Sequence, residues 1–186
     1  MKTIRSYLYG RVEVAVGDIT LYDGDAIVNA ANSALAGGGG VDGTIHRAAG
    51  PELSAECRSL RMGSLPDGLP TGRAVATGAG RLAVRGVIHA VGPIWRGGTA
   101  DESRLLASAY TEALSIAEAR GWDRVAFPAI STGVYGYPKA LAARVAFEAV
   151  SSYLASRDRP RLVSLVFFSQ ADAEAFMASI GEPEAS

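Results

Sequence analysis

Short apolar segments alternate with amphipathic segments along most of this chain. Near the N-terminus, two segments rich in β-branched and aromatic residues, 4–9 and 11–16, meet at Gly10 and predict a hairpin or a pair of neighbouring strands. Later apolar segments are short and bounded by turn residues, which is typical of buried strands. These later predicted strands are 26–29, 73–77, 86–91, 124–127 and 162–168.

The predicted helices lie between these strands. Residues 101–120 give the clearest pattern, because apolar residues recur every three or four positions and Gly121 follows as a stop signal. Strands that alternate with helices indicate βαβ crossovers and a largely parallel sheet covered on both faces. The expected fold class is therefore α/β. The other predicted helices are 44–49, 51–60, 138–155 and 171–180.

Two unusual loops follow predicted strands. The first, 29–43, carries four consecutive glycines, and the second, 129–138, carries Ser, Thr and two further glycines. Ligands of open parallel sheets bind beyond the carboxyl ends of the strands. The two loops are therefore predicted to form one site.

The glycine run of the first loop has two interpretations. Flexible linkers are usually Ser-rich with polar flanks, whereas this run has apolar, structured flanks, which favours a ligand loop. Bare backbone amides followed by a helix N-terminus would form a cradle for an anion. Asp42 lies at the mouth of this cradle. It is either a helix cap, for which Asp is a preferred residue, or a catalytic acid.

The same glycines match a dinucleotide-binding pattern, Gly38-x-Gly40-x-x-Gly43. A nicotinamide-binding unit would need an acidic residue about twenty positions later, at the end of the next strand. The available acids, Glu52 and Glu56, lie in a predicted helix instead. This class of site is therefore rejected.

Composition limits the classes of partner. The 186 residues have 48% hydrophobic composition and a net charge of −1, which predicts one globular domain over 1–181 and a short flexible tail over 182–186. The balanced charge predicts no stable binding to nucleic acid or to an anionic membrane. The N-terminus lacks the apolar core of a signal peptide, and no segment approaches the ~20 apolar residues of a membrane helix. A cytoplasmic protein is expected.

The sequence predicts neither a disulfide framework nor a metal site. Cys57 is the only cysteine, and the two histidines, His46 and His89, form no recognised ligand pair. Histidines inside apolar segments are usually structural residues with satisfied hydrogen bonds. A structural role is therefore expected for both, and no metal or cofactor is expected.

Several motifs occur in an order that resembles a known family. They are Gly17-Asp18-Ile19-Thr20, Asn29-Ala30-Ala31-Asn32, 37–43 followed by His46-Arg47-Ala48-Ala49-Gly50, Pro70-Thr71-Gly72, 87–93 and 131–136. Together they resemble macrodomains of the MacroD type over roughly residues 10 to 180. The resemblance implies a three-layer α/β/α fold with a mixed, mostly parallel sheet and a cleft for ADP-ribose.

The resemblance also implies roles for individual residues. Asp18 would recognise adenine with help from the backbone of Ile19, Asn32 would orient the distal ribose, and Asp42 would activate water. On residues alone, Asp18 and Asn32 would be read as turn formers. The resemblance further places ligand contacts at Asn29, Gly39, Gly40 and Val41.

The second loop has its own implied roles. Ser131, Thr132, Gly133 and Val134 match the clamp for the diphosphate, and Tyr135 would pack over a ribose rather than cover the core. Phe168 would lie against the adenine ring, although core packing is nearly as good an interpretation. Arg73 departs from the family, in which many members carry an acidic or amide residue at this position, and its effect is not explained by the sequence.

The implied activity is a mono-ADP-ribosyl hydrolase that cleaves the ester between C1″ of ADP-ribose and Glu or Asp side chains, and that also deacetylates O-acetyl-ADP-ribose. A monomer acting on ADP-ribosylated proteins is expected. The rival interpretations are a non-catalytic ADP-ribose reader and an ADP-ribose 1″-phosphate phosphatase. Branches that use a lysine adduct or paired glutamates are disfavoured, because Lys2 and Lys139 lie outside the first loop and the chain has no Glu-Glu pair.

Overall fold

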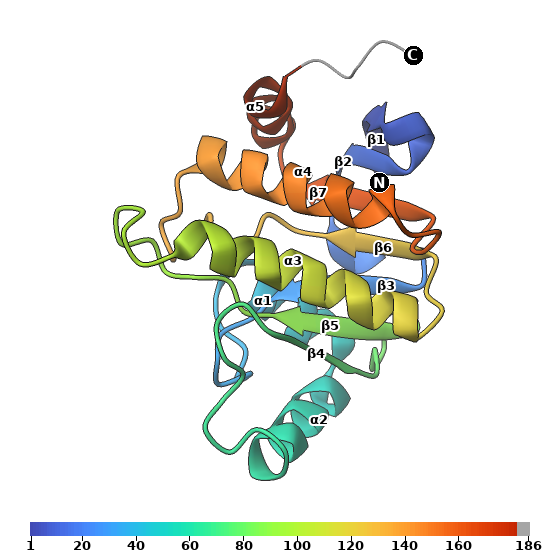
Figure 1. Ribbon diagram of the computed structural model, residues 1–186. Helices are drawn as coiled ribbons and strands as arrows, with labels where there is room; N and C mark the ends of the chain where they lie inside the picture. The colour runs from blue at the N-terminus through green and yellow to red at the C-terminus, as the bar shows by residue number, and fades with distance from the viewer. Residues whose placement is uncertain (182–186) are drawn as a thin grey trace.

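The computed structural model describes residues 1–181, and the predicted tail at 182–186 lies outside the described residues. A seven-stranded sheet in the order β1-β2-β7-β6-β3-β5-β4 forms the centre of these residues, and helices cover its two faces (Figure 1). None of the helices in the described range combines the length and apolar character needed to cross a membrane. The strands are β1 (Lys2–Tyr7), β2 (Val12–Val16), β3 (Ala26–Ala30), β4 (Ala74–Thr77), β5 (Gly86–Ala90), β6 (Arg124–Phe127) and β7 (Leu162–Phe167).

The sheet is mixed and mostly parallel, as the sequence predicts. The inner neighbours β2, β7, β6, β3 and β5 all pair in parallel, whereas β1 and β4 pair antiparallel at the two edges. A short 3₁₀ turn at Leu8–Gly10 joins β1 to β2, so the predicted pairing across Gly10 is confirmed. The parallel arrangement brings the carboxyl ends of the inner strands to one edge of the sheet.

The helices divide between the two faces. In Figure 1, α3 and α4 cross in front of the sheet, whereas α1 lies behind it. Packing contacts link α3 to α4 and α4 to α5, and link α1 to α2. The result is the three-layer α/β/α arrangement expected from the sequence. The helices are α1 (Gly40–Ala49), α2 (Pro51–Met62), α3 (Glu102–Ala119), α4 (Lys139–Ala155) and α5 (Gln170–Ile180).

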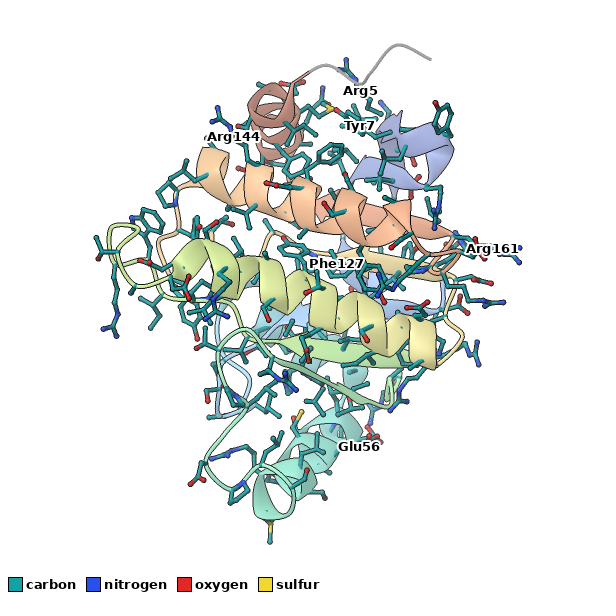
Figure 2. The ribbon with its side chains drawn as sticks, viewed as in Figure 1. Arg5, Tyr7, Glu56, Phe127, Arg144 and Arg161 are labelled. Carbon is teal, nitrogen blue, oxygen red and sulfur yellow. The ribbon has the colours of Figure 1, made fainter. Side chains whose placement is uncertain are left out.

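Side chains that alternate along the strands pack into two hydrophobic cores, one on each face of the sheet. Neighbouring residues of a strand point to opposite faces, so Val28 packs into the core below α3, α4 and α5 while Ile27 packs into the core below α1 and α2. Phe127 lies in the first of these layers, between the sheet and α3 (Figure 2), where its ring stacks on Tyr110 at 5.3 Å between centroids. Burial on both faces explains why the inner strands read as continuous apolar runs.

Two element boundaries differ from the sequence prediction in ways that affect the site. Helix α1 begins at Gly40 rather than at Thr44, so its first turn is built from part of the glycine run. Strand β7 ends at Phe167 rather than Phe168, which leaves Phe168 87% exposed. Core packing is therefore the wrong interpretation of Phe168.

Candidate functional site

A cavity of about 850 Å³ opens at the edge of the sheet where the inner parallel strands end. Its wall contains segments that follow β2, β3, β6 and β7, and the first turn of α1. Both unusual loops therefore line one cavity, as the sequence predicts. Of the residues predicted for the site, those in the wall are Asp18, Ile19, Asn32, Gly39, Gly40, Val41, Asp42, Ser131, Thr132, Gly133, Val134, Tyr135 and Phe168.

The first loop presents the N-terminus of α1 to the cavity. Gly39 is the N-cap residue and contributes no side-chain hydrogen bond. The first amides of a helix have no partners within the helix and carry partial positive charge, so they favour a negatively charged ligand. The turn requires glycine at Gly37 and Gly40, where φ is +75° and +60°.

Asp42 lies in the first turn of α1 and does not cap the helix, so the capping interpretation is wrong. Its side chain is buried at the cavity wall, with the whole residue 6% exposed. The Asn29 amide donates to Oδ1 at 2.7 Å and the Asn32 amide donates to Oδ2 at 3.4 Å. Two neighbouring side chains therefore hold both oxygens of this carboxylate in place.

Asn32 bridges the carboxylate and the glycine loop. Besides its contact with Asp42, its amide donates to the carbonyl of Gly37 at 2.7 Å. His46 lies one helical turn after Asp42, and its Nε2 is 3.5 Å from Asp42 Oδ1. The other ring nitrogen of His46, Nδ1, is hydrogen-bonded to Ser54 Oγ at 3.1 Å. The carboxylate is thus surrounded by groups that favour a fixed orientation.

Asn29 is the predicted site residue that the structure does not bring into the cavity wall. It is fully buried behind Asp42, and its amide also contacts His89 Nδ1 at 3.1 Å. His89 Nε2 in turn lies 3.0 Å from the hydroxyl of Thr77. Asn29 therefore supports the Asp42 carboxylate from beneath and is not itself part of the cavity wall.

The second loop is held in a strained conformation close to the sheet. Ser131 has φ +67°, which is uncommon for a residue with a side chain and typical of functional loops. A Cβ at Gly92 would lie 2.2 Å from Ser131 Oγ, so the tight approach of the two segments requires glycine there. The Ser131 hydroxyl is buried and finds no hydrogen-bond partner within residues 1–181.

Backbone amides of the second loop remain available to a ligand. The hydrogen bonds that close the loop use the amides of Gly136 and Tyr137, which donate to Gly133 and Ser131. In the described part of the chain, the amides of 132–135 make no hydrogen bond. Two segments with unpaired amides, this loop and the start of α1, therefore line one cavity, an arrangement suited to a diphosphate.

Glu102 supports the second loop, a role that the sequence analysis missed. Its carboxylate accepts hydrogen bonds from the backbone amides of Arg96, Gly98 and Ala100 at 2.6 to 3.1 Å, which folds segment 94–101. From this segment the Trp95 amide donates to the Tyr135 carbonyl at 2.8 Å. Burial alone would raise the pKa of Glu102, but these amides lower it below its usual range.

Comparison with known proteins agrees with this geometry. A sequence model described as the Macro domain matches residues 28–146. The chain belongs to the macrodomain family. The resemblance drawn from its motifs is therefore confirmed.

Several relatives resemble this macrodomain over nearly its whole length. A protein of Cronobacter sakazakii named O-acetyl-ADP-ribose deacetylase is 52% identical, and the match covers 93% of this chain and 95% of the relative. A macro domain-containing protein of Streptomyces coelicolor is 55% identical over 91% of this chain and 98% of its own.

Solved structures give the same result. The Oceanobacillus iheyensis macrodomain with ADP is 43% identical with a TM-score of 0.87, covering 91% of this chain and 89% of its own. The Trypanosoma brucei macrodomain in complex with ADP-ribose is 34% identical with a TM-score of 0.82, covering 92% and 70%. The three-layer fold predicted for this macrodomain is confirmed.

Asp18 and Phe168 both lie in the cavity wall of this macrodomain. Asp18 caps a short 3₁₀ helix (η2, Ile19–Leu21), and both of its hydrogen bonds, from the Thr20 amide and hydroxyl, use Oδ1. In the described residues neither bond uses Oδ2. Asp18 is thus a turn former that still presents an oxygen to the cavity.

Arg73 lies outside the cavity wall. Its guanidinium pairs with Glu112 of α3 at 3.2 Å, and both side chains are partly exposed. Surface ion pairs of this kind contribute little to stability. The family departure at Arg73 therefore changes an exposed contact and not the wall of the cavity.

A group of possible metal ligands lies below the site, formed by His46, Cys57 and His89, whose ligand atoms are within 4.8 Å of one another. Both His89 nitrogens already have polar neighbours, and His46 contacts Ser54. Burial raises the pKa of Cys57 to about 11, which disfavours the thiolate that binds metals. Contacts within the described residues occupy both His89 nitrogens and His46 Nδ1, whereas His46 Nε2 makes no hydrogen bond and lies 3.5 Å from Asp42 Oδ1.

The buried His89 predicts a loss of stability in mild acid. Burial, together with the nearby His46, lowers the pKa of His89 from 6.5 to about 3. Between the folded-state and unfolded-state pKa values, the unfolded chain therefore binds more protons than the folded chain, and the free energy of unfolding decreases as the pH is lowered. Between about pH 6.5 and 5, urea titration should show a decrease approaching about 1.4 kcal/mol per pH unit from this group.

His89→Asn serves as the comparison for this effect. The Asn variant has no proton to gain at this position, so its free energy of unfolding should change less over the same pH interval. Carboxylates with lowered pKa values, such as those of Asp25 and Asp172, lose their contribution only at lower pH. Equal slopes for both proteins would contradict the assignment of the acid effect to His89.

Proposed function

We propose that this macrodomain binds ADP-ribose in the cavity and hydrolyses esters on the distal ribose. O-acetyl-ADP-ribose is the first proposed substrate, and esters that link ADP-ribose to Glu or Asp side chains of proteins are the second. The names of the relatives support the first substrate, and the cavity geometry is compatible with both because each presents an ester at the same sugar.

The single observation that carries this proposal is the placement of Asp42. A carboxylate whose two oxygens are held by Asn29 and Asn32 lies in the wall of a cavity that also contains two sets of free backbone amides. A negative charge next to an anion site weakens binding of a phosphate-containing ligand, so a purely binding protein gains nothing from it. A hydrolase uses such a carboxylate to activate water.

In this proposal the backbone amides bind the substrate and the Asp42 carboxylate activates water. Amides at the start of α1 and in loop 132–135 hold the diphosphate, which fixes the distal ribose and its ester near Asp42. Asp42 accepts a proton from a water molecule as the water oxygen bonds to the ester carbonyl carbon. The bond from that carbon to the ribose oxygen then breaks, and the proton passes to the ribose oxygen. The products are ADP-ribose and the free carboxylic acid.

Asp18 is proposed to bind the exocyclic amino group of adenine through Oδ2, with Phe168 against the ring. In Asp18→Asn the side-chain oxygen is kept at the Oδ1 position by the two Thr20 donors, so an NH₂ group replaces Oδ2. That group cannot accept from the adenine amino group, so the hydrogen bond is lost and ADP-ribose binding should weaken at least about tenfold. Calorimetry with ADP-ribose and with ribose 5-phosphate would measure the effect. Because ribose 5-phosphate lacks adenine, its affinity should not change, and an equal loss for both ligands would contradict the adenine role.

Two assays on the wild-type protein test the proposed function. Calorimetry should detect ADP-ribose binding, and chromatography should detect conversion of O-acetyl-ADP-ribose to ADP-ribose and acetate. Glutamate-linked and serine-linked mono-ADP-ribosylated proteins should then be compared, because only the glutamate linkage is an ester. Release from the glutamate-linked protein alone supports ester hydrolysis. Binding without release from any substrate would instead identify a non-catalytic reader.

A further inference from the structure

A buried chain of polar side chains behind the cavity leads to Asp42 and is not used in the proposed reaction. It runs from Asp42 through Asn29 on β3 and His89 on β5 to Thr77 on β4. The three supporting residues are at most 4% exposed. Burying polar groups costs free energy unless they are hydrogen-bonded, so a chain of this length in the centre of the fold calls for an explanation.

The direction of each hydrogen bond follows from chemistry. An oxygen of Asn29 facing the Asp42 carboxylate would be repelled, so the NH₂ group must face it. The same NH₂ group lies 3.1 Å from His89 Nδ1, and its second hydrogen points there. His89 Nδ1 is therefore an acceptor, and the ring proton is on Nε2, which donates to Thr77 Oγ1 at 3.0 Å. The Thr77 hydroxyl then donates to the Gly78 carbonyl at 3.0 Å.

This arrangement gives His89 one tautomer and one task. The pKa of about 3 keeps the ring neutral at physiological pH, so Nδ1 retains the lone pair that accepts from Asn29. The other titratable groups near the ring, His46 and Cys57, lie on α1 and α2. The register of the sheet sets His89 directly beside Asn29, which fixes the distance between the two side chains.

We propose that His89 is a positioning residue for the hydrolysis: by accepting one hydrogen of the Asn29 amide, it turns the other hydrogen toward Asp42 and holds the carboxylate in its working orientation. The inference rests on the proposed function, since it assigns a role within the same reaction. His89 is not part of the cavity wall, and in this proposal it acts only through Asn29.

Two substitutions distinguish the role of His89 Nδ1 from the role of His89 Nε2. His89→Asn places an oxygen close to the position of Nδ1, which can still accept from Asn29, but it cannot reach Thr77. His89→Gln places its amide close to the position of Nε2, which can still contact Thr77, but it leaves Asn29 without an acceptor. The pair therefore compares loss of the bond to Asn29 with loss of the bond to Thr77, which fixes the tautomer of a histidine ring and has no such effect in the Asn variant.

The expected result is a difference in kcat without a difference in binding. His89→Gln should lower kcat for O-acetyl-ADP-ribose at least tenfold, whereas His89→Asn should stay within about threefold of wild type. Both variants should bind ADP-ribose with wild-type affinity by calorimetry. Equal kcat values for the two variants, or loss of affinity in step with loss of kcat, would overturn the proposal because either result indicates a structural role alone.

A double-mutant cycle tests whether His89 acts through Asn29. In an Asn29→Ala background, His89→Gln should cause no further loss of kcat, because the amide it positions is gone. Additive losses would overturn the proposal. If His89→Gln does not fold, Thr77→Val takes its place. The Val variant frees the ring to change tautomer and should lower kcat about fivefold with unchanged affinity, and an unchanged kcat would overturn the proposal.

The wild-type protein distinguishes failure of this inference from failure of the proposed function. If wild type binds ADP-ribose but releases nothing from either ester, the proposed hydrolysis fails and His89 has no reaction to support. If wild type hydrolyses the ester and His89→Gln does so equally well, hydrolysis stands and only the positioning role is wrong.

Discussion

Replacing Asp42 by asparagine is expected to lower kcat for O-acetyl-ADP-ribose hydrolysis by about 10²–10⁴-fold, the usual range for loss of a general base. The asparagine side chain has the same shape and keeps an oxygen that can accept from Asn29. The local structure should therefore survive while the group that takes the proton from water is lost. A stopped chromatographic assay at saturating substrate measures the change.

Binding should respond differently from turnover in the Asp42→Asn protein. Removing a negative charge from the wall should leave ADP-ribose affinity unchanged or slightly raised, since the charge repels the diphosphate. Glu52→Gln is the matched control, because it also removes one carboxylate, from an exposed ion pair with Arg81 outside the cavity wall. The control should keep full kcat. Full turnover in Asp42→Asn would remove Asp42 from the mechanism.

The sequence predicts the fold of this protein well because the central sheet is buried on both faces. Each inner strand is buried on both faces and reads as an apolar run, and each helix carries a periodic apolar face, so the alternation of the two is visible without a structure. The edge strands were also recovered, since Gly10 separates β1 from β2. Placing both loops at one end of the sheet followed from the parallel topology alone.

The boundaries near the site could not be predicted from the pattern. A glycine run has no side chains and therefore no periodicity, so nothing in residues 37–43 marked where helix α1 begins. The start depends on tertiary packing, because the first turn rests against the loop that precedes it. Phe168 was ambiguous for a related reason: an apolar run shows that a strand is buried but not at which residue it leaves the core.

The supporting residues were harder to assign than the wall residues. Asn29 was expected in the wall, yet the alternation of β3 turns it away from the cavity and beneath Asp42. A signal was present, since β3 and β5 each carry a single polar residue at the fourth position, Asn29 and His89, and the register pairs these two. Glu102 acts through backbone amides of a loop, and no spacing rule identifies such partners.

Close backbone approach should make Gly43, next to the cavity wall, intolerant of any side chain. Replacing Gly43 by alanine should lower ADP-ribose affinity about 100-fold, because a Cβ there would lie 2.2 Å from the Gly38 carbonyl oxygen. The obstacle is backbone, so the glycine loop or the first turn of α1 must shift. Overpacking of this kind costs about 1–3 kcal/mol, and about 1.4 kcal/mol corresponds to tenfold in affinity.

The backbone shift in Gly43→Ala should also lower the free energy of unfolding, and a second substitution in the same loop, Gly39→Ala, serves as the control. Gly39→Ala adds a methyl group that meets no atom within 4 Å, at a φ of −89° that alanine adopts readily. Urea denaturation should therefore show an unchanged free energy of unfolding for Gly39→Ala and a decrease of about 1–3 kcal/mol for Gly43→Ala. If Gly43→Ala kept wild-type stability and affinity, the cradle would not depend on contact between the glycine loop and α1, and the diphosphate would have to be held chiefly by the amides of loop 132–135.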